Sequence, residues 1–382
     1  MSLKFKTTQP NFARGSKRKS QMQKNKRVVQ ILKIIMPIVG IVCIVVFPPW
    51  DGIWAWIAPL PDTVQEQVDD AIGYGLDGII IYVDKGGEPP AFYSAGWKNK
   101  VTQVPADPHA LFKIASISKL YIATATVKLI NNQSLSLDDT LADLLPELAG
   151  KIDYADQITL RMMLQHRSGI PNFTDQDKFD WFTPQTDIDK TLELVLDQPA
   201  DFRPDARYNY SNTNYLLIAR ILDKVLGYSH EQYIDNEILV PLGLTNTYFS
   251  ISQAKYEDVV SGYWYQYDDD LRHLYFLIPG GSMVATAQDV GIFLRALNDG
   301  SLLNDDEQAI YASVYEYGHT GWLPGYYSIA RYHEDIDAVV VQFVNTTGGT
   351  PMIQFFNISG GTKVMVSDVV YSRIVRILRG KN

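Results

Sequence analysis

Apolar runs bounded by turn residues predict strands near both ends of the main part of the chain. Gly78–Val83 and Ala91–Trp97 are two such runs, separated by a turn rich in glycine and proline. Tyr326–Arg331 and Ala338–Asn345 form a second pair, joined through the polar segment "YHEDID". Short runs rich in β-branched and aromatic residues are typical of strands. The pattern therefore predicts that strands from both ends build one sheet.

Helical periodicity dominates the chain between these strand pairs and also flanks them. Apolar residues recur there at the three- and four-residue spacing of a helix face. The predicted helices cover Val64–Ile72, 118–132, Leu192–Leu196, Tyr215–Leu226, Gln288–Leu297 and Val364–Leu378. Strands at both ends and helices between them indicate an α+β fold. We expect an antiparallel sheet flanked by helices, with a helical insert at roughly 120–275.

The segment 28–48 begins with twenty almost uninterrupted apolar residues, "VVQILKIIMPIVGIVCIVVF". Twenty helical residues extend for about 30 Å, the thickness of the hydrocarbon core of a bilayer. Trp50, Trp54 and Trp56 follow, and tryptophan is enriched where a membrane meets water. The pattern predicts an N-terminal transmembrane helix at 28–48.

Charge is distributed unevenly along the chain. Residues 1–27 contain nine Lys/Arg and no acidic residue, so the net charge of −9 divides into +9 there and −18 in the rest. Basic residues gather on the cytoplasmic side of a membrane helix. We therefore expect a cytoplasmic tail and a folded domain on the periplasmic (extracytoplasmic) side of the cell inner membrane. The acidic remainder also argues against nucleic acid as a partner.

These features divide the chain into four parts. Residues 1–27 form the basic tail, 28–48 the single-pass membrane helix, 49–63 a proline-containing linker and 64–382 the folded domain. A cleaved signal peptide is the alternative for the N-terminal segment. The long basic region, the length of the apolar run and the lack of an Ala-x-Ala site favour an uncleaved anchor.

Composition excludes several chemistries. Cys43 is the single cysteine, so an intrachain disulfide and a cysteine-based zinc site are impossible. His230-Glu231 and His333-Glu334 lack the second histidine of a zinc protease motif. The sequence also has no Gly-x-Ser-x-Gly elbow and no Gly-x-x-x-x-Gly-Lys phosphate loop. We expect neither a metal nor a cofactor.

The stretch "FKIASISKL" contains Ser116 and, three residues later, Lys119. The helix expected over 118–132 makes Ser116 a first-turn residue. The helix dipole and free backbone N–H groups there favour an alkoxide. Lys119 projects from the same face, and its apolar neighbours desolvate it. A desolvated lysine has a lowered pKa and can accept a proton.

The spacing alone is weak, because it also occurs at Ser16-x-x-Lys19 in the basic tail and at Ser252-x-x-Lys255 in a polar segment. Neither of these has a long apolar helix behind it. The simple alternative for the first pair is a helix cap and a surface charge. Two further motifs argue against that alternative.

The segment "YNYSNTNY" places Tyr210 and Asn212 in one tight turn. A phenol can relay a proton where a lysine cation lowers its pKa, and an amide can hold a lysine and a substrate carbonyl. Near the C-terminus, "HTGW" opens a predicted strand. Its glycine allows close backbone approach, and the N–H that follows can point into an oxyanion hole. The residues of this third motif are His319, Thr320, Gly321 and Trp322.

These three motifs, in this order, resemble those of the penicillin-recognising serine hydrolases. The likeness is to the class C β-lactamase branch, with its D-alanyl-D-alanine carboxypeptidases and esterases. It extends from about Val64 to the C-terminus. It includes the segments "LFKIASISKLYIATATVKLINNQSLSLDDTLADLLPEL", "LRMMLQHRSGIPNF", "PGGSMVATAQDVGIFLRAL" and "GHTGWLPGYYSIARYHEDIDAVVVQFVNT". The resemblance implies a β-lactamase/transpeptidase-like fold.

The resemblance also implies catalytic roles. Ser116 would attack a carbonyl and become acylated, and water would later release the acyl group. Lys119 and Tyr210 would share the proton transfers, with Asn212 holding them. His109, His166, His230, His273 and His333 receive no role.

The third motif both extends the resemblance and departs from it. His319 to Gly321 would line the substrate, and the backbone N–H groups of Ser116 and Trp322 would form the oxyanion hole. β-Lactamases usually have a lysine at the first position, where its charge meets the carboxylate of the drug. Here it is His319, as in the esterases and peptidases, and the bulky Trp322 narrows the acyl pocket.

The sequence thus predicts a membrane-anchored serine hydrolase that forms an acyl-Ser116 intermediate on an ester, an amide or a D-amino-acid peptide. A true β-lactamase acting on penicillins or cephalosporins is one alternative. A catalytically inactive, membrane-tethered binding protein of the same fold is another. The expected partners are a small-molecule or peptide substrate and the membrane, through 28–48. The oligomeric state stays open.

Overall fold

The computed structural model describes residues 30, 32–37, 39–40, 50–349 and 361–380. It divides the chain into two units, Met1–Trp50 and Asp51–Asn382. The predicted basic tail 1–27, and most of the predicted membrane helix 28–48, lie outside the described residues. Within the described residues, no helix combines the length and the apolar character needed to cross a bilayer.

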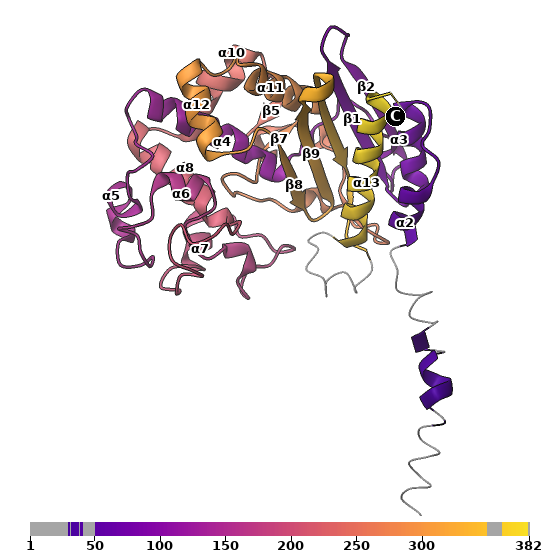
Figure 1. Cartoon of the computed structure of the whole chain (residues 1–382), viewed down its shortest axis with the longest axis horizontal. Helices are drawn as coiled ribbons and strands as arrows, with labels where there is room; N and C mark the ends of the chain where they lie inside the picture. Colours follow the sequence, from indigo (N-terminus) through magenta and orange to yellow (C-terminus); the bar gives the residue numbers. More distant parts are fainter. Residues whose placement is uncertain (1–29, 31, 38, 41–49, 350–360, 381–382) are drawn as a thin grey trace, which may run out of the picture. The chain divides into compact units, whose positions relative to one another are not determined.

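A six-stranded antiparallel sheet forms the centre of the second unit (Figure 1). Its order is β3-β2-β1-β10-β9-β8. The strands are β1 (Gly78–Lys85), β2 (Ala91–Asn99), β3 (Val104–Pro105), β8 (His319–Leu323), β9 (Tyr326–His333) and β10 (Ala338–Val344). β1 pairs with β10, from Ile79 opposite Val344 to Lys85 opposite Ala338. This pairing joins a strand from the first part of the folded domain to one from its last part. The predicted sheet is confirmed.

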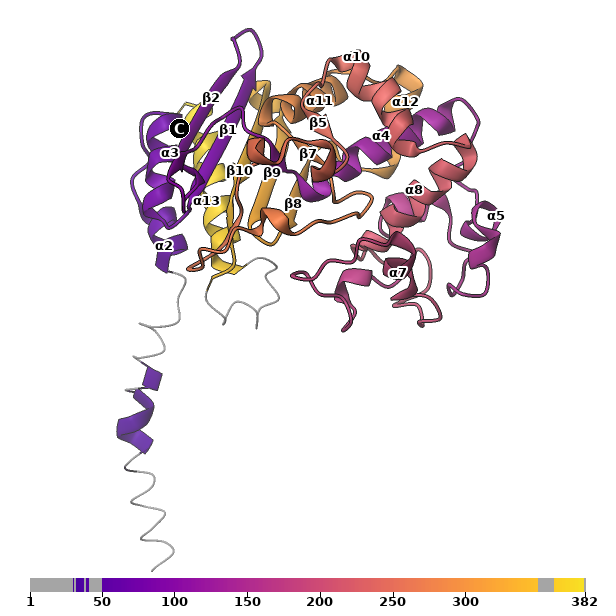
Figure 2. The ribbon, with the colours of Figure 1, turned by 180° about the vertical axis from the view of Figure 1, so that it is seen from behind.

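Helices cover both faces of this sheet (Figure 2). The face with α3 (Val64–Gly73) and α13 (Gly361–Leu378) buries Ile79 and Ile81 of β1. The opposite face, with α11 (Ala287–Asp299), buries Ile80 and Tyr82. A strand buried on both faces is apolar throughout, which explains the uninterrupted "IIIYV" of β1.

A helical region adjoins the sheet, with α4 passing through its core. Its helices are α4 (Ser118–Asn131), α5 (Leu141–Leu144), α6 (Leu160–Leu164), α7 (Ile188–Glu193), α8 (Asn212–Leu226), α9 (His230–Ile234), α10 (Val240–Leu242) and α12 (Asp305–Val314). A three-stranded sheet contains β4 (Phe112–Lys113), β7 (Val284–Ala285) and β5 (Thr247–Tyr248). A two-stranded one pairs β6 (Tyr263–Trp264) with β11 (Thr346–Thr347).

Short 3₁₀ turns and one π turn (η4) connect these elements. They are η1 (Ala115–Ile117), η2 (Pro146–Leu148), η3 (Phe173–Asp175), η4 (Asp235–Leu239), η5 (Ile251–Gln253), η6 (Tyr256–Asp258), η7 (Leu271–His273) and η8 (Glu334–Ile336).

Two sequence expectations differ from the structure. The helix predicted at Leu192–Leu196 is instead α7, Ile188–Glu193. The side chain of Asp187 accepts the backbone N–H groups of the first turn, and this cap sets the start of the helix. The predicted linker 49–63 contains a helix, α2 (Trp50–Ile57).

Candidate active site

Ser116 lies in η1, directly before α4. Every residue from Leu111 to Val127 is buried except Ser116, which is half-buried. The preceding Ala115 has φ = 50°, a left-handed conformation that costs about 1–2 kcal/mol for a residue with a side chain. The Ser118 hydroxyl donates to the Ala115 carbonyl at 2.6 Å and supports this turn. A rigid, buried frame therefore presents one accessible hydroxyl.

Lys119 is fully buried, and its Nζ has three oxygen neighbours. They are Gly280 O at 2.7 Å, Asn212 Oδ1 at 2.9 Å and Ser116 Oγ at 3.0 Å. The first two are acceptors only, so each takes one N–H of the amine. In the neutral amine the lone pair then faces the serine hydroxyl. Burial lowers the pKa of Lys119 to about 7, which makes this neutral form accessible.

Tyr210 approaches the same hydroxyl from another element. Its OH donates to Ser116 Oγ at 2.8 Å. Burial raises the pKa of Tyr210, and the hydrogen bond to Ser116 lowers it by less. The sequence led us to expect a lysine-lowered pKa at this phenol. The structure instead has a protonated phenol as a hydrogen-bond donor, because desolvation dominates.

Asn212 holds Lys119 and is itself held by a loop whose residues the three sequence motifs do not include. Its backbone N–H donates to Asn172 Oδ1 at 3.0 Å. Its Nδ2 lies 3.3 Å from both Asn172 Oδ1 and Thr174 Oγ1. Asn172 belongs to the segment "LRMMLQHRSGIPNF", whose resemblance to the family was the available signal.

His166, which received no role from the sequence, supports the turn that carries Tyr210. Its Nδ1 accepts the Ser211 backbone N–H at 3.2 Å, and its ring lies 4.5 Å from the Tyr210 ring. Burial lowers the pKa of His166 to about 3, so the ring is neutral and Nδ1 stays an acceptor. We infer that His166 positions Tyr210.

The third motif forms β8, the edge strand beside Ser116, and begins with an uncharged side chain. His319 is buried, and burial lowers its pKa to about 3. Its Nδ1 contacts the Thr320 carbonyl, and its Nε2 lies 3.6 Å from Glu316 Oε1. This end of the site therefore has a neutral imidazole beside a carboxylate, where β-lactamases have a fixed cation.

Gly321 allows β8 to pack directly against the backbone that leads to Ser116. A Cβ at this position would lie 2.3 Å from Ile114 O and 2.4 Å from Ser328 Oγ. The Ser328 hydroxyl also donates to Ile114 O at 2.9 Å. The close backbone approach predicted for this glycine is present, and it is made to the residues Ile114 and Ala115 that precede Ser116.

We expect Gly321→Ala to lower kcat/KM about 100-fold, because the methyl group must push β8 away from η1 and misplaces the reacting groups. Gly73→Ala is the matched control, since nothing lies within 4 Å of its added Cβ. The measurement is ester or amide hydrolysis at equal folded concentration. Unchanged activity of Gly321→Ala would refute the packing argument.

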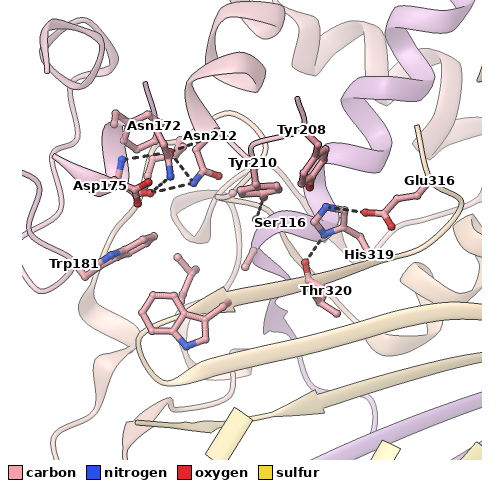
Figure 3. A pocket seen from close by; sticks show the side chains of 17 residues that line it. Ser116, Asn172, Asp175, Trp181, Tyr208, Tyr210, Asn212, Glu316, His319 and Thr320 are labelled. Carbon is pink, nitrogen blue, oxygen red and sulfur yellow. Dashed lines mark hydrogen bonds and ion pairs between the residues drawn. The ribbon is translucent and has the colours of Figure 1, made fainter. Parts of the chain in front are cut away.

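A cavity of about 570 Å³ opens beside Ser116. Trp181 and Trp322 form an aromatic wall, with ring centroids 5.0 Å apart. Figure 3 shows Glu316 beside His319 and Asp175 beside Asn172, on opposite sides of Ser116. The charged residues that line the cavity, among those described, are these two acids. The cavity is therefore acidic and partly aromatic.

The structure brings together Ser116, Lys119, Tyr210, Asn212 and the third motif, although they come from separate parts of the chain. The fold and this arrangement define a serine hydrolase. The family profile described as Beta-lactamase matches residues 60–315. The chain belongs to the beta-lactamase family, within the penicillin-recognising serine hydrolases.

Individual relatives agree with this assignment. Protein flp of Staphylococcus aureus is 28% identical over 213 residues, 53% of this chain and 42% of flp. The match therefore spans less than half the length of flp. The putative penicillin-binding protein PbpX of Bacillus subtilis is 26% identical over 292 residues, 71% of each chain. The D-amino acid amidase of Ochrobactrum anthropi SV3 has the same fold, with a TM-score of 0.71 and 22% identity over 83% of this chain and 99% of the amidase.

Proposed function

We propose that this enzyme hydrolyses an ester, an amide or a D-amino-acid peptide through an acyl-Ser116 intermediate. The observation that carries the proposal is the placement of Lys119 Nζ and Tyr210 OH, at 3.0 and 2.8 Å from one accessible serine oxygen. A nucleophile within hydrogen-bond distance of a base, with that base oriented by further groups, is the arrangement that acyl transfer requires. An amide substrate is also supported by the structural likeness to the D-amino acid amidase.

The proposed reaction has two stages. Neutral Lys119 takes the hydroxyl proton of Ser116 while Oγ bonds to the substrate carbonyl carbon. The backbone N–H groups of Ser116 and Trp322 stabilise the tetrahedral oxyanion. The proton then passes to the leaving group, directly or through Tyr210, and the acyl-enzyme remains. In the second stage neutral Lys119 takes a proton from water, and the water oxygen attacks the acyl carbon. The bond between the acyl carbon and Ser116 Oγ then breaks, Oγ takes the proton back from Lys119 3.0 Å away, and the acid leaves.

The charge of the cleft favours neutral or cationic substrates over β-lactams. In a β-lactamase the third-motif lysine meets the carboxylate of the drug. Here that position is a neutral His319 with the Glu316 carboxylate 3.6 Å away. Burial raises the pKa of Glu316, and the nearby Arg331 cation lowers it by less. An anionic group at this end would therefore meet repulsion from ionised Glu316 instead of an ion pair, and this repulsion grows as the pH rises. We therefore place true β-lactamase activity second, and esters or amides with no negative charge there first.

We expect matched substrates with a carboxylate, a carboxamide or an ammonium group at this position to react in ascending order of kcat/KM. Glu316→Gln should reduce the ratio of kcat/KM between the ammonium and the carboxylate substrates about 3- to 10-fold, because it removes one partly exposed charge. Asp175→Asn, near Asn172, is the control and should change this ratio of kcat/KM values less. Faster reaction of the carboxylate substrate would contradict the charge argument without affecting the role of Ser116.

We also propose that residues 28–48 anchor the enzyme in the cell inner membrane, with the catalytic domain on the extracytoplasmic side. The support is the sequence itself: nine basic residues precede a twenty-residue apolar run. The test is membrane sedimentation of the full chain at alkaline pH, compared with a chain lacking residues 1–49. Release of the full chain into the supernatant would refute the anchor.

A further inference from the structure

Helix α2, "WDGIWAWI", has its single charged residue on the side that faces the protein. Gly52 and Ala55 are buried, and a Cβ on Gly52 would lie 2.2 Å from Met365 Cε. Asp51 forms an ion pair with Lys363 of α13 at 2.6 Å. Asp51, Gly52 and Ala55 together occupy about 100° of the helix circumference, at 100° per residue.

Buried cations of α13 hold α2 and the segment after it in place. Lys363 is 0% exposed and also donates to the Tyr74 carbonyl at 2.8 Å. Arg373, also buried, donates to the carbonyls of Ala58 at 2.8 Å and Pro59 at 2.6 Å. Removing partners from buried charges is costly, so α2 is fixed to the catalytic domain.

The outer side of α2 is entirely apolar. Trp54 is 58% exposed, Trp56 74% and Ile57 52%, and Ile53 lies between them. These four residues span about 160° of the helix, opposite the buried side. A surface helix normally turns its apolar side inward and its charges outward. In α2 the charge faces inward and the apolar side chains face outward. An exposed apolar patch of this kind marks a contact with lipid or protein.

We propose that the outer side of α2 lies in the lipid–water interface and fixes the orientation of the catalytic domain on the membrane. The occupant follows from the chain itself, because the apolar run of the predicted anchor ends at Phe47, three residues before α2. Tryptophan side chains favour this interface. The inference rests on the anchor proposed above. Since α2 is fixed to α13, the interface would orient the domain and not only tether it.

The test uses the full chain in lipid vesicles with a nitroxide at one site. Cys43→Ser removes the single cysteine, and Ile57→Cys then places the label beside both tryptophans. Val240→Cys is the matched control, because Val240 is an exposed apolar residue (66%) elsewhere in the domain. Collision rates with lipid-soluble oxygen and with a water-soluble nickel chelate report the surroundings of each label.

We expect the label at residue 57 to collide mainly with oxygen and the label at 240 mainly with the chelate. Adding Trp54→Ser and Trp56→Ser should move residue 57 toward the water-like ratio while the chain still sediments with vesicles. A label at 57 that meets the chelate freely in membrane-bound protein refutes the α2 contact alone. Shielding from both reagents indicates a protein contact, such as a second copy, and also refutes it. A chain that does not sediment refutes the anchor and, with it, this inference.

Discussion

Replacing Ser116 with alanine should reduce turnover of every substrate by about 10⁴-fold or more, the loss typical of a missing nucleophile. The physical reason is that Lys119 Nζ and Tyr210 OH both converge on this one oxygen. Without Ser116 Oγ, the buried amine and the phenol have no nucleophile to activate. The fold should persist, because Ser116 is half-buried and alanine fits the same space. The measurement is steady-state hydrolysis of an activated ester.

Ser252→Ala is the matched control, since Ser252 and Lys255 repeat the same spacing outside the site. It should retain wild-type rates. Thermal unfolding of both variants separates loss of chemistry from loss of structure. Turnover by folded Ser116→Ala at a rate near that of the wild type would remove the basis of the proposed mechanism.

Lys119→Met should lower kcat about 10³-fold, within the range for a general base. The pH profile of the wild-type enzyme should report the titration of Lys119. Burial lowers the pKa of Lys119 to about 7, and only the neutral amine can accept the serine proton. Activity should therefore fall below pH 7, where the amine is protonated, and rise to a plateau above it. The measurement is kcat/KM from pH 5 to 9, which reports the free enzyme.

Two variants make this result specific. Lys113 is a second buried lysine whose pKa is lowered to about 7, but its Nζ donates to backbone carbonyls, including Leu274 at 2.7 Å. Lys113→Met should change stability and leave the midpoint of the pH profile in place. Tyr210→Phe should lower kcat less than Lys119→Met, because Lys119 and not the phenol accepts the proton from the Ser116 hydroxyl. A wild-type pH profile that is flat across pH 7 would show that a group other than Lys119 is the general base.

Much of the fold is predictable because its signals are local. The uninterrupted apolar run of β1 and the short apolar runs of β9 and β10 are recognisable without any partner. Helix ends are less predictable, since α7 begins where the Asp187 side chain caps it. The predicted linker 49–63 shows the same limit. Lys363 holds α2 and Arg373 holds the segment after it, and both cations stand more than 300 positions later in the sequence.

The site residues divide in a similar way. Ser116, Lys119, Tyr210 and Asn212 lie in short motifs, and the order of these motifs along the chain, with the apolar helix after Ser116, indicates them. The Gly280 carbonyl that orients Lys119 belongs to the segment "PGGSMVATAQDVGIFLRAL", whose resemblance to the family is a signal for the segment but not for this carbonyl. Only folding brings it within 2.7 Å of Nζ. The pKa of Tyr210 also depends on burial by distant segments, which spacing cannot reveal.

The most direct test of the account is the intact mass of the full-length protein after exposure to an activated short-chain ester and, separately, to a penicillin. The account predicts a covalent adduct or rapid ester turnover, with the added mass on the peptide that contains Ser116, and no adduct in Ser116→Ala. A folded protein that gains no mass and turns over neither compound would contradict it and favour a binding protein of the same fold. An adduct on any other residue would contradict the assignment of Ser116.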